Sequence, residues 1–111
     1  KKARPQRFGI AWWIEREGQV WLVRRPAKGM LGGMAALPGP EWQDEPVWTS
    51  SLVHVTHVFT HFALDLAVVA NAKPQGEGWW QPLDRLHESG LPTLYRKAAA
   101  AVLAARPALA A

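Results

Sequence analysis

The sequence contains no cysteine. A disulfide, a thiolate nucleophile and a zinc or iron–sulfur centre held by cysteine are therefore excluded within this chain. It also lacks an apolar run of membrane-spanning length, and we expect neither a signal peptide nor a transmembrane segment. A length of 111 residues is enough for one domain with its own core.

Acidic residues are in the minority, with 9 Asp and Glu against 13 Lys and Arg, which gives a formal net charge of +4. This balance permits a polyanionic partner such as nucleic acid. The same charge is also what keeps an ordinary small domain soluble. Charge alone therefore does not decide whether the chain binds a polyanion.

Phenylalanine and tyrosine are few, whereas tryptophan occurs seven times. Large aromatic side chains dominate cores, and some hold bases by stacking. We expect three of them, Trp13, Trp21 and Trp48, to fill core or half-buried sheet positions. The others are candidates for an exposed patch on which another domain docks: Trp12, Trp42, Trp79 and Trp80.

Hydrophobic patterning and turn residues predict a mixed α+β fold with a mixed β-sheet flanked by helices. Strands are expected at residues 8–13 and 20–25, with a hairpin turn at 15–18.

In the second half of the chain, residues 53–70 are expected to form one long strand or a strand pair bent near Thr60-His61, and another short element is expected to begin at 79–83. A short helix or turn is expected within 41–52. A helix at 94–105 is capped by Thr93 and stopped by Pro107.

Three of the four histidines lie in V-H-V-T-H-V-F-T-H-F, residues 53–62. On a helix, His54, His57 and His61 would share a face and suggest a metal site. The intervening residues are β-branched or aromatic and favour a strand, on which His54 and His57 point to opposite sides. The sequence therefore predicts no metal site here.

Three segments in order resemble the C-terminal domain of MutY-type adenine DNA glycosylases. They are L-V-R-R-P-A-K-G-M-L-G-G-M-A-A-L-P-G at 22–39, V-F-T-H-F-A-L-D-L at 58–66 and L-P-T-L-Y-R-K at 91–97. The resemblance implies the Nudix fold, also that of MutT. The sequence departs from the family at Thr60, where Phe-Ser-His is usual, and at Ala35-Ala36, where Trp-Glu often precedes Phe-Pro.

The resemblance implies that residues 8–107 are a Nudix-like 8-oxoguanine recognition domain, with 1–7 a linker remnant and 108–111 a tail. The expected partners are double-stranded DNA containing 8-oxoguanine opposite adenine and an N-terminal catalytic domain of the same protein. That catalytic domain would carry the iron–sulfur cluster and remove the adenine. For this chain we expect no cofactor, no catalytic residue, no membrane partner, a monomeric state, and a cytoplasmic, nucleoid-associated location in a bacterium.

Phe59, Thr60 and His61 are the candidate recognition residues. Without the resemblance, the threonine and the histidine would be interpreted as ordinary surface residues of a strand, and the phenylalanine as a core residue. The resemblance favours a role of these residues in recognising 8-oxoguanine. A hydroxyl accepts from the N7–H of 8-oxoguanine, where guanine has an acceptor, so Thr60 is the candidate for that contact. His61 is a candidate donor to a phosphate or base, and Phe59 a packing residue.

The glycine-rich stretch after the second strand is a second candidate site. Glycines allow backbone N–H groups to approach a phosphate, and neighbouring cations add charge. The candidate residues are Arg24, Arg25, Lys28, Gly29, Gly32 and Gly33. The alternative is that Gly32-Gly33 only makes a tight bend beside solvated arginines.

The alternative function is a Nudix hydrolase acting on a nucleoside diphosphate-linked substrate. Such an enzyme needs an acidic helix after the Leu-Pro-Gly loop to hold Mg²⁺. After Gly39 the chain offers Glu41, Asp44 and Glu45, followed at once by Pro46, and no Arg-Glu-x-x-Glu-Glu occurs in the sequence. We therefore expect these acids to lie on the surface.

Overall fold

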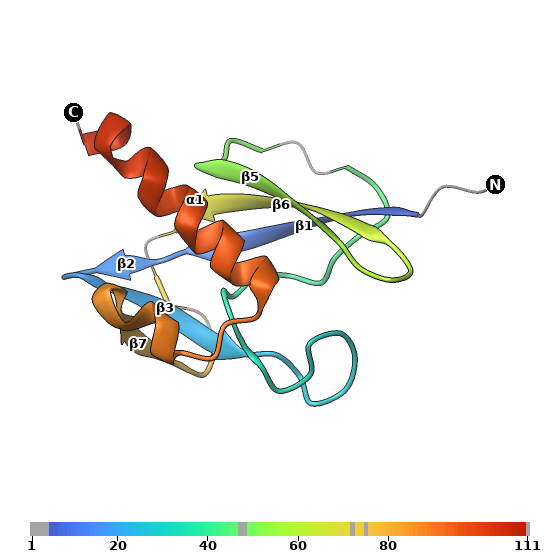
Figure 1. Cartoon of the computed structure of the whole chain (residues 1–111), viewed down its shortest axis with the longest axis horizontal. Coiled ribbons are helices and arrows are strands. Elements are labelled where there is room, and N and C mark those ends of the chain that lie inside the picture. The colour runs from blue at the N-terminus through green and yellow to red at the C-terminus, as the bar shows by residue number, and fades with distance from the viewer. Residues whose placement is uncertain (1–4, 47–48, 72, 75, 111) are drawn as a thin grey trace.

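The expected mixed α+β architecture is confirmed in the computed structural model, which describes residues 5–46, 49–71, 73–74 and 76–110. A three-stranded sheet and a four-stranded sheet with shorter strands lie beside one long helix (Figure 1). The apolar side chains of both sheets and of the helix meet in one core. Among the described residues, no helix combines the length and apolarity needed to cross a bilayer.

The three-stranded sheet is built from β1 (Gln6–Trp13), β5 (Val53–Val58) and β6 (Ala63–Ala70). β6 is central, pairing in parallel with β1 and antiparallel with β5, so the sheet is mixed as expected. Leu64, Leu66 and Val68 of β6 alternate toward the core. The long segment from residue 53 to 70 is thus a strand pair, with the chain reversing at Thr60-His61.

The second sheet contains β2 (Glu15–Arg16), β3 (Gln19–Arg24), β4 (Ala35–Ala36) and β7 (Gly78–Pro82). The strands β2, β4 and β7 each pair directly with β3. A hairpin turn does lie within the expected residues 15–18, but it joins β2 to β3, because β1 pairs with β6 in the other sheet. Glu17 and Gly18 both have positive φ, 53° and 77°, as a two-residue turn matched to the strand twist requires.

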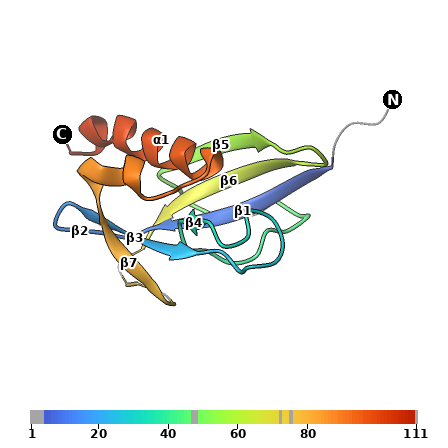
Figure 2. The same ribbon diagram turned by 60° about the horizontal axis from the view of Figure 1, so that its bottom comes forward.

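The helix α1 (Thr93–Ala110) covers the core side of β5 and β6 (Figures 1 and 2). Its buried residues recur at helical spacing, at Leu94, Tyr95, Ala98 and Val102. The prediction that the helix stops at Pro107 is wrong. A proline this close to the end removes one hydrogen bond of the ladder, and the surrounding alanines favour helix.

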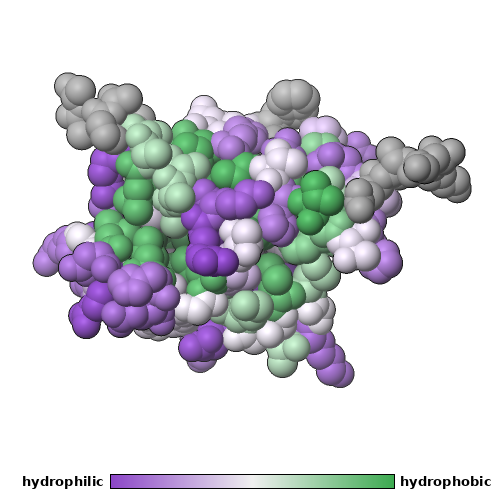
Figure 3. Space-filling model, in the orientation of Figure 1, coloured by the Kyte–Doolittle hydropathy of each residue, from purple (hydrophilic) through white to green (hydrophobic). Residues whose placement is uncertain are grey.

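Two further expectations change in the structure. The described part of residues 41–52 contains no helix; instead Phe8 and Gln43 exchange backbone hydrogen bonds, each 2.7 Å long, which ties this segment to β1. The second helical element is instead the 3-10 helix η1 (Leu83–Glu88). Apolar side chains gather along α1 and toward η1 on the face shown in Figure 3, where a shallow groove separates the two helices.

Candidate nucleic-acid interface

The turn between β5 and β6 presents Thr60 and His61 to solvent. The strand pairing ends at Val58 opposite Ala63, and the Phe59 N–H donates to the Phe62 carbonyl oxygen over 2.8 Å, which closes the turn. Both central side chains, Thr60 and His61, are exposed, whereas the flanking phenylalanines are half-buried. We call residues 59–62 the hairpin tip.

Three aromatic rings support this tip from the core side, and we call Trp42, Phe59 and Phe62 the aromatic platform. Trp42 stacks on Phe59 with ring centroids 5.9 Å apart and an angle of 29° between the planes. Phe62 lies 4.9 Å from Phe59 and 6.1 Å from Trp42. The platform packs against the main core. The expected packing role of Phe59 thus has a geometric basis, and its most important partner, Trp42, is distant in sequence.

His57 joins the tip to the start of α1. Its ring meets Phe59 edge-on at 4.8 Å, and its Nδ1 lies 3.2 Å from the Nζ of Lys97. The same ammonium donates to the Thr56 carbonyl oxygen over 2.6 Å. Burial, and secondarily the positive charge of Lys97, lowers the pKa of His57 below 6.5. A neutral His57 therefore accepts a hydrogen bond from Lys97 at neutral pH.

The glycine loop, residues 26–33, has a backbone that other residues adopt only with strain. Gly29 and Gly33 have φ values of 95° and 73°, and Leu31 also has a positive φ. A Cβ on Gly32 would lie 2.3 Å from the Ala27 carbonyl oxygen. The Gly33 N–H donates within the loop, 3.1 Å from the carbonyl oxygens of Arg25 and Pro26. The glycines thus form a tight bend. The expected contacts between their backbone N–H groups and a phosphate remain a prediction.

The adjacent residues Arg24 and Arg25 turn to different partners. Arg24 lies over the Trp79 ring at 5.0 Å, whereas Arg25 lies over the Trp42 ring at 4.5 Å. Arg25 also donates from Nε to the Met30 carbonyl oxygen over 2.8 Å and from Nη1 to the Tyr95 hydroxyl over 3.1 Å. Arg25 therefore ties the glycine loop to the platform and to α1.

Tyr95 is buried, and this burial raises the pKa of its hydroxyl, an effect that the Arg25 guanidinium partly offsets. A hollow of about 380 Å³ separates the tip from the glycine loop and the start of α1. Its walls include Met34, His57, Phe59 and Arg96. The tip and the glycine loop therefore lie at one end of the molecule, as Figures 1 and 2 both show.

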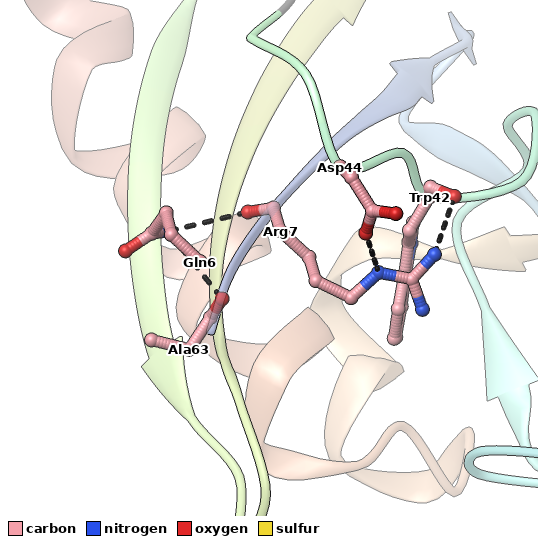
Figure 4. A network of polar contacts seen from close by, with 5 residues as sticks. All are labelled: Gln6, Arg7, Trp42, Asp44 and Ala63. Carbon is pink, nitrogen blue, oxygen red and sulfur yellow. Dashed lines mark hydrogen bonds and ion pairs between the residues drawn. The ribbon is translucent and has the colours of Figure 1, made fainter. Parts of the chain in front are cut away.

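The acids that follow Gly39 do not form a cation site. Glu41, Asp44 and Glu45 are exposed, and the Asp44 carboxylate pairs with Arg7 at 3.3 Å (Figure 4). Within the part of the chain that the structure describes, no group of three His, Asp or Glu side chains is arranged to hold a metal ion. The described acids after Gly39 are therefore not arranged as ligands for the Mg²⁺ of a Nudix hydrolase.

The remaining histidines and tryptophans are also placed by the fold. His54 points away from His57, as expected for a strand, and its Nδ1 lies 3.4 Å from an oxygen of Asp65. Trp13 is buried. The tryptophans expected to include an exposed patch are all half-buried: Trp12, Trp42, Trp79 and Trp80. Trp48 lies outside the described residues.

Comparisons with known proteins assign the family. A NUDIX domain model matches residues 9–101, and the chain belongs to the NUDIX domain family. A comparison with curated protein sequences gave no match.

The fold is similar to those of two solved structures. One is the solution structure of the E. coli ORF135 protein, with a TM-score of 0.68 and 16% identity over 95% of this chain and 94% of that one. The other is a MutT NUDIX hydrolase from Burkholderia pseudomallei, with a TM-score of 0.60 and 18% identity over 87% and 98%. At these identities the likeness shows the Nudix fold.

Proposed function

We propose that this Nudix domain is the DNA-recognition domain of an adenine DNA glycosylase and that it recognises 8-oxoguanine opposite a mispaired adenine. The observation that carries the proposal is the hairpin tip, where Thr60 and His61 are exposed on a supported turn. A tip held by packed rings needs little further ordering when it meets a rigid duplex, which lowers the cost of binding.

The chemistry of the tip suits the oxidised base. In 8-oxoguanine the N7 nitrogen carries a proton, so a hydroxyl that accepts there distinguishes it from guanine, whose N7 is an acceptor. Thr60 supplies that acceptor, and His61 supplies a donor to a neighbouring phosphate or base. One such contact is worth about 1–3 kcal/mol of discrimination, so the catalytic domain has to share the recognition.

The surroundings of the tip favour a nucleic-acid partner. The glycine loop at the same end of the molecule carries the exposed Lys28, and Arg96 lines the hollow between loop and tip. Together with a net charge of +4, these cations suit the phosphates on either side of a base that is being contacted.

The runner-up is a Nudix hydrolase of nucleoside diphosphate-linked substrates, with which the family and the fold are equally consistent. The segment after Gly39 favours the recognition domain over the hydrolase. Its acidic side chains are exposed to solvent, and Pro46 lies in the part of the sequence where a Nudix hydrolase has its acidic helix. Within the proposal, the chain works as a monomer beside a catalytic domain that holds the iron–sulfur cluster, in a cytoplasmic and nucleoid-associated setting.

Thr60→Val tests the proposal, because valine keeps the shape and removes the hydroxyl. The affinity of the chain is measured for duplexes that contain 8-oxoguanine·adenine or guanine·adenine. We expect the preference for the oxidised duplex to fall by about tenfold, which is a loss of about 1.4 kcal/mol. Thr60→Ser is the matched control and keeps the preference. An unchanged preference in Thr60→Val removes Thr60 from the recognition site.

A further inference from the structure

A second hollow, of about 330 Å³, is lined by Trp42 and gathers cations from separate parts of the chain. Arg7 comes from β1, Arg25 directly precedes the glycine loop, and Lys28 lies within that loop. Residues 39–42 line another part of the hollow, with Glu41 as the one carboxylate among the described lining residues. We call this the basic hollow.

We infer that the basic hollow binds a phosphate group of the DNA backbone. This inference rests on the proposed function for the identity of the polymer, but not on which base is recognised. Arg7 is the new member of the site, since it is far from the glycine loop in sequence and reaches the hollow only through the fold.

The two guanidinium groups are held in place with donors to spare. The Nη2 group of Arg7 donates to the Trp42 carbonyl oxygen over 2.9 Å, and its Nε faces Asp44 (Figure 4). Arg25 is fixed by Met30, Tyr95 and the Trp42 ring. Guanidinium groups have more N–H donors than these contacts use, and a positioned guanidinium is the preferred partner of phosphate oxygens.

The charges around the hollow also suit an anion. Its lining carries three cations against Glu41, and the Asp44 carboxylate beside Arg7 is 85% exposed to solvent, which screens its charge. A phosphate diester in the hollow would meet the remaining guanidinium N–H groups of Arg7 and Arg25 together with the Lys28 ammonium, and the negative charge of the nearby Asp44 carboxylate would oppose it. Lys28 is exposed and supplies a mobile charge at the rim.

The position of the hollow connects it with the hairpin tip. Trp42 lines the hollow, carries Arg25 over its ring, and stacks on Phe59. A phosphate bound in the hollow would therefore lie beside the same indole that supports the tip, and Arg7 of the hollow also lies 5.6 Å from the Phe62 ring of the tip. This arrangement sets the register of the duplex against Thr60, because phosphate contacts position a protein while base contacts specify the sequence.

The test uses two exposed substitutions that act in opposite directions. Lys28→Gln removes a positive charge from the lining of the hollow, and Asp44→Asn removes a negative charge beside Arg7 that opposes a bound phosphate. Lys73→Gln and Asp84→Asn are the matched controls, since they make the same charge changes at other exposed positions. Affinity for an unmodified duplex is measured over a salt series, and inorganic phosphate is titrated while the Trp42 indole N–H and the Arg7 and Arg25 Nε–H signals are followed by NMR.

We expect Asp44→Asn to tighten duplex binding about two- to fivefold more than Asp84→Asn, the range of an exposed ion pair. We expect Lys28→Gln to weaken it and to reduce the salt slope by about 1. Inorganic phosphate should shift the three N–H signals, and duplex should displace it. Identical behaviour of Asp44→Asn and Asp84→Asn, or no phosphate-induced shift, overturns the site, and phosphate binding that duplex does not displace overturns its assignment to DNA. Because no oxidised base is used, failure here is separate from failure of base recognition by Thr60.

Discussion

Trp42 stacks on Phe59 across a gap of 5.9 Å between ring centroids, which joins the segment after β4 to the hairpin tip. We expect Trp42→Ala to lower the free energy of unfolding by about 2–3 kcal/mol, less than for a fully buried tryptophan because the ring is half-buried. Urea denaturation measures this loss. Val58→Ala, at a side chain that is 57% exposed, is the control and should have little effect. Equal stability of Trp42→Ala and the wild type would show that the platform does not support the tip.

The glycine loop should tolerate alanine differently at its individual positions. At Gly32 a Cβ would meet the Ala27 carbonyl oxygen at 2.3 Å, whereas at Gly29 it would enter open space and carry only the strain of a positive φ. We expect Gly29→Ala to cost about 1–2 kcal/mol, and Gly32→Ala to cost more because backbone atoms must move. Thermal denaturation of both variants gives the ranking, and a larger loss at Gly29 would contradict the loop geometry.

His57 should make stability depend on pH. Its pKa is lowered in the folded chain, so stabilisation by the neutral ring is present above the unfolded value of 6.5 and is lost as the pH falls through the folded value. Protonation places a second positive charge 3.2 Å from Lys97 Nζ. We expect His57→Gln to lose less stability than the wild type between pH 7 and acidic pH, measured by urea denaturation. A His87→Gln variant, at an exposed histidine of η1, serves as the control. Parallel pH curves for the wild type and His57→Gln would refute this account.

The acids after Gly39 should support no hydrolysis of nucleotides. Glu41 and Asp44 are exposed, and Asp44 is paired with Arg7. We expect purified chain to release no phosphate or pyrophosphate from nucleoside triphosphates or diphosphate-linked nucleosides when Mg²⁺ or Mn²⁺ is added. Turnover that persists through purification and disappears in Glu41→Gln would favour the hydrolase instead.

The residue types within each segment predict where the strands lie more reliably than they predict which strands pair with one another. The β-branched residues around His57 indicate a strand, as the structure confirms, and the sequence is compatible with the chain reversal found at Thr60-His61. The prediction that the C-terminal helix ends at Pro107 was wrong, because the helix propensity of the neighbouring alanines outweighs one missing hydrogen bond near a helix end. The 3-10 helix at 83–88 carries too weak a periodicity to be recognised in the sequence.

The site was harder to predict because its residues are joined by tertiary contacts. Nothing in the dipeptide Arg24-Arg25 reveals that one side chain covers Trp79 and the other Trp42. The side chains of adjacent residues on an extended chain point in opposite directions. Which aromatic ring each of them contacts depends on segments that are far away in the sequence. Arg7 was missed for the same reason, since its relation to Lys28 exists only after β1 pairs with β6.

The most direct test of 8-oxoguanine recognition by this domain is an NMR titration of the chain with duplexes containing 8-oxoguanine·adenine or guanine·adenine. We expect larger amide shifts with the oxidised duplex at Thr60 and His61, and similar shifts with both duplexes around Lys28. Equal shifts at the tip with both duplexes, or no shift there, would contradict recognition of the oxidised base by this domain.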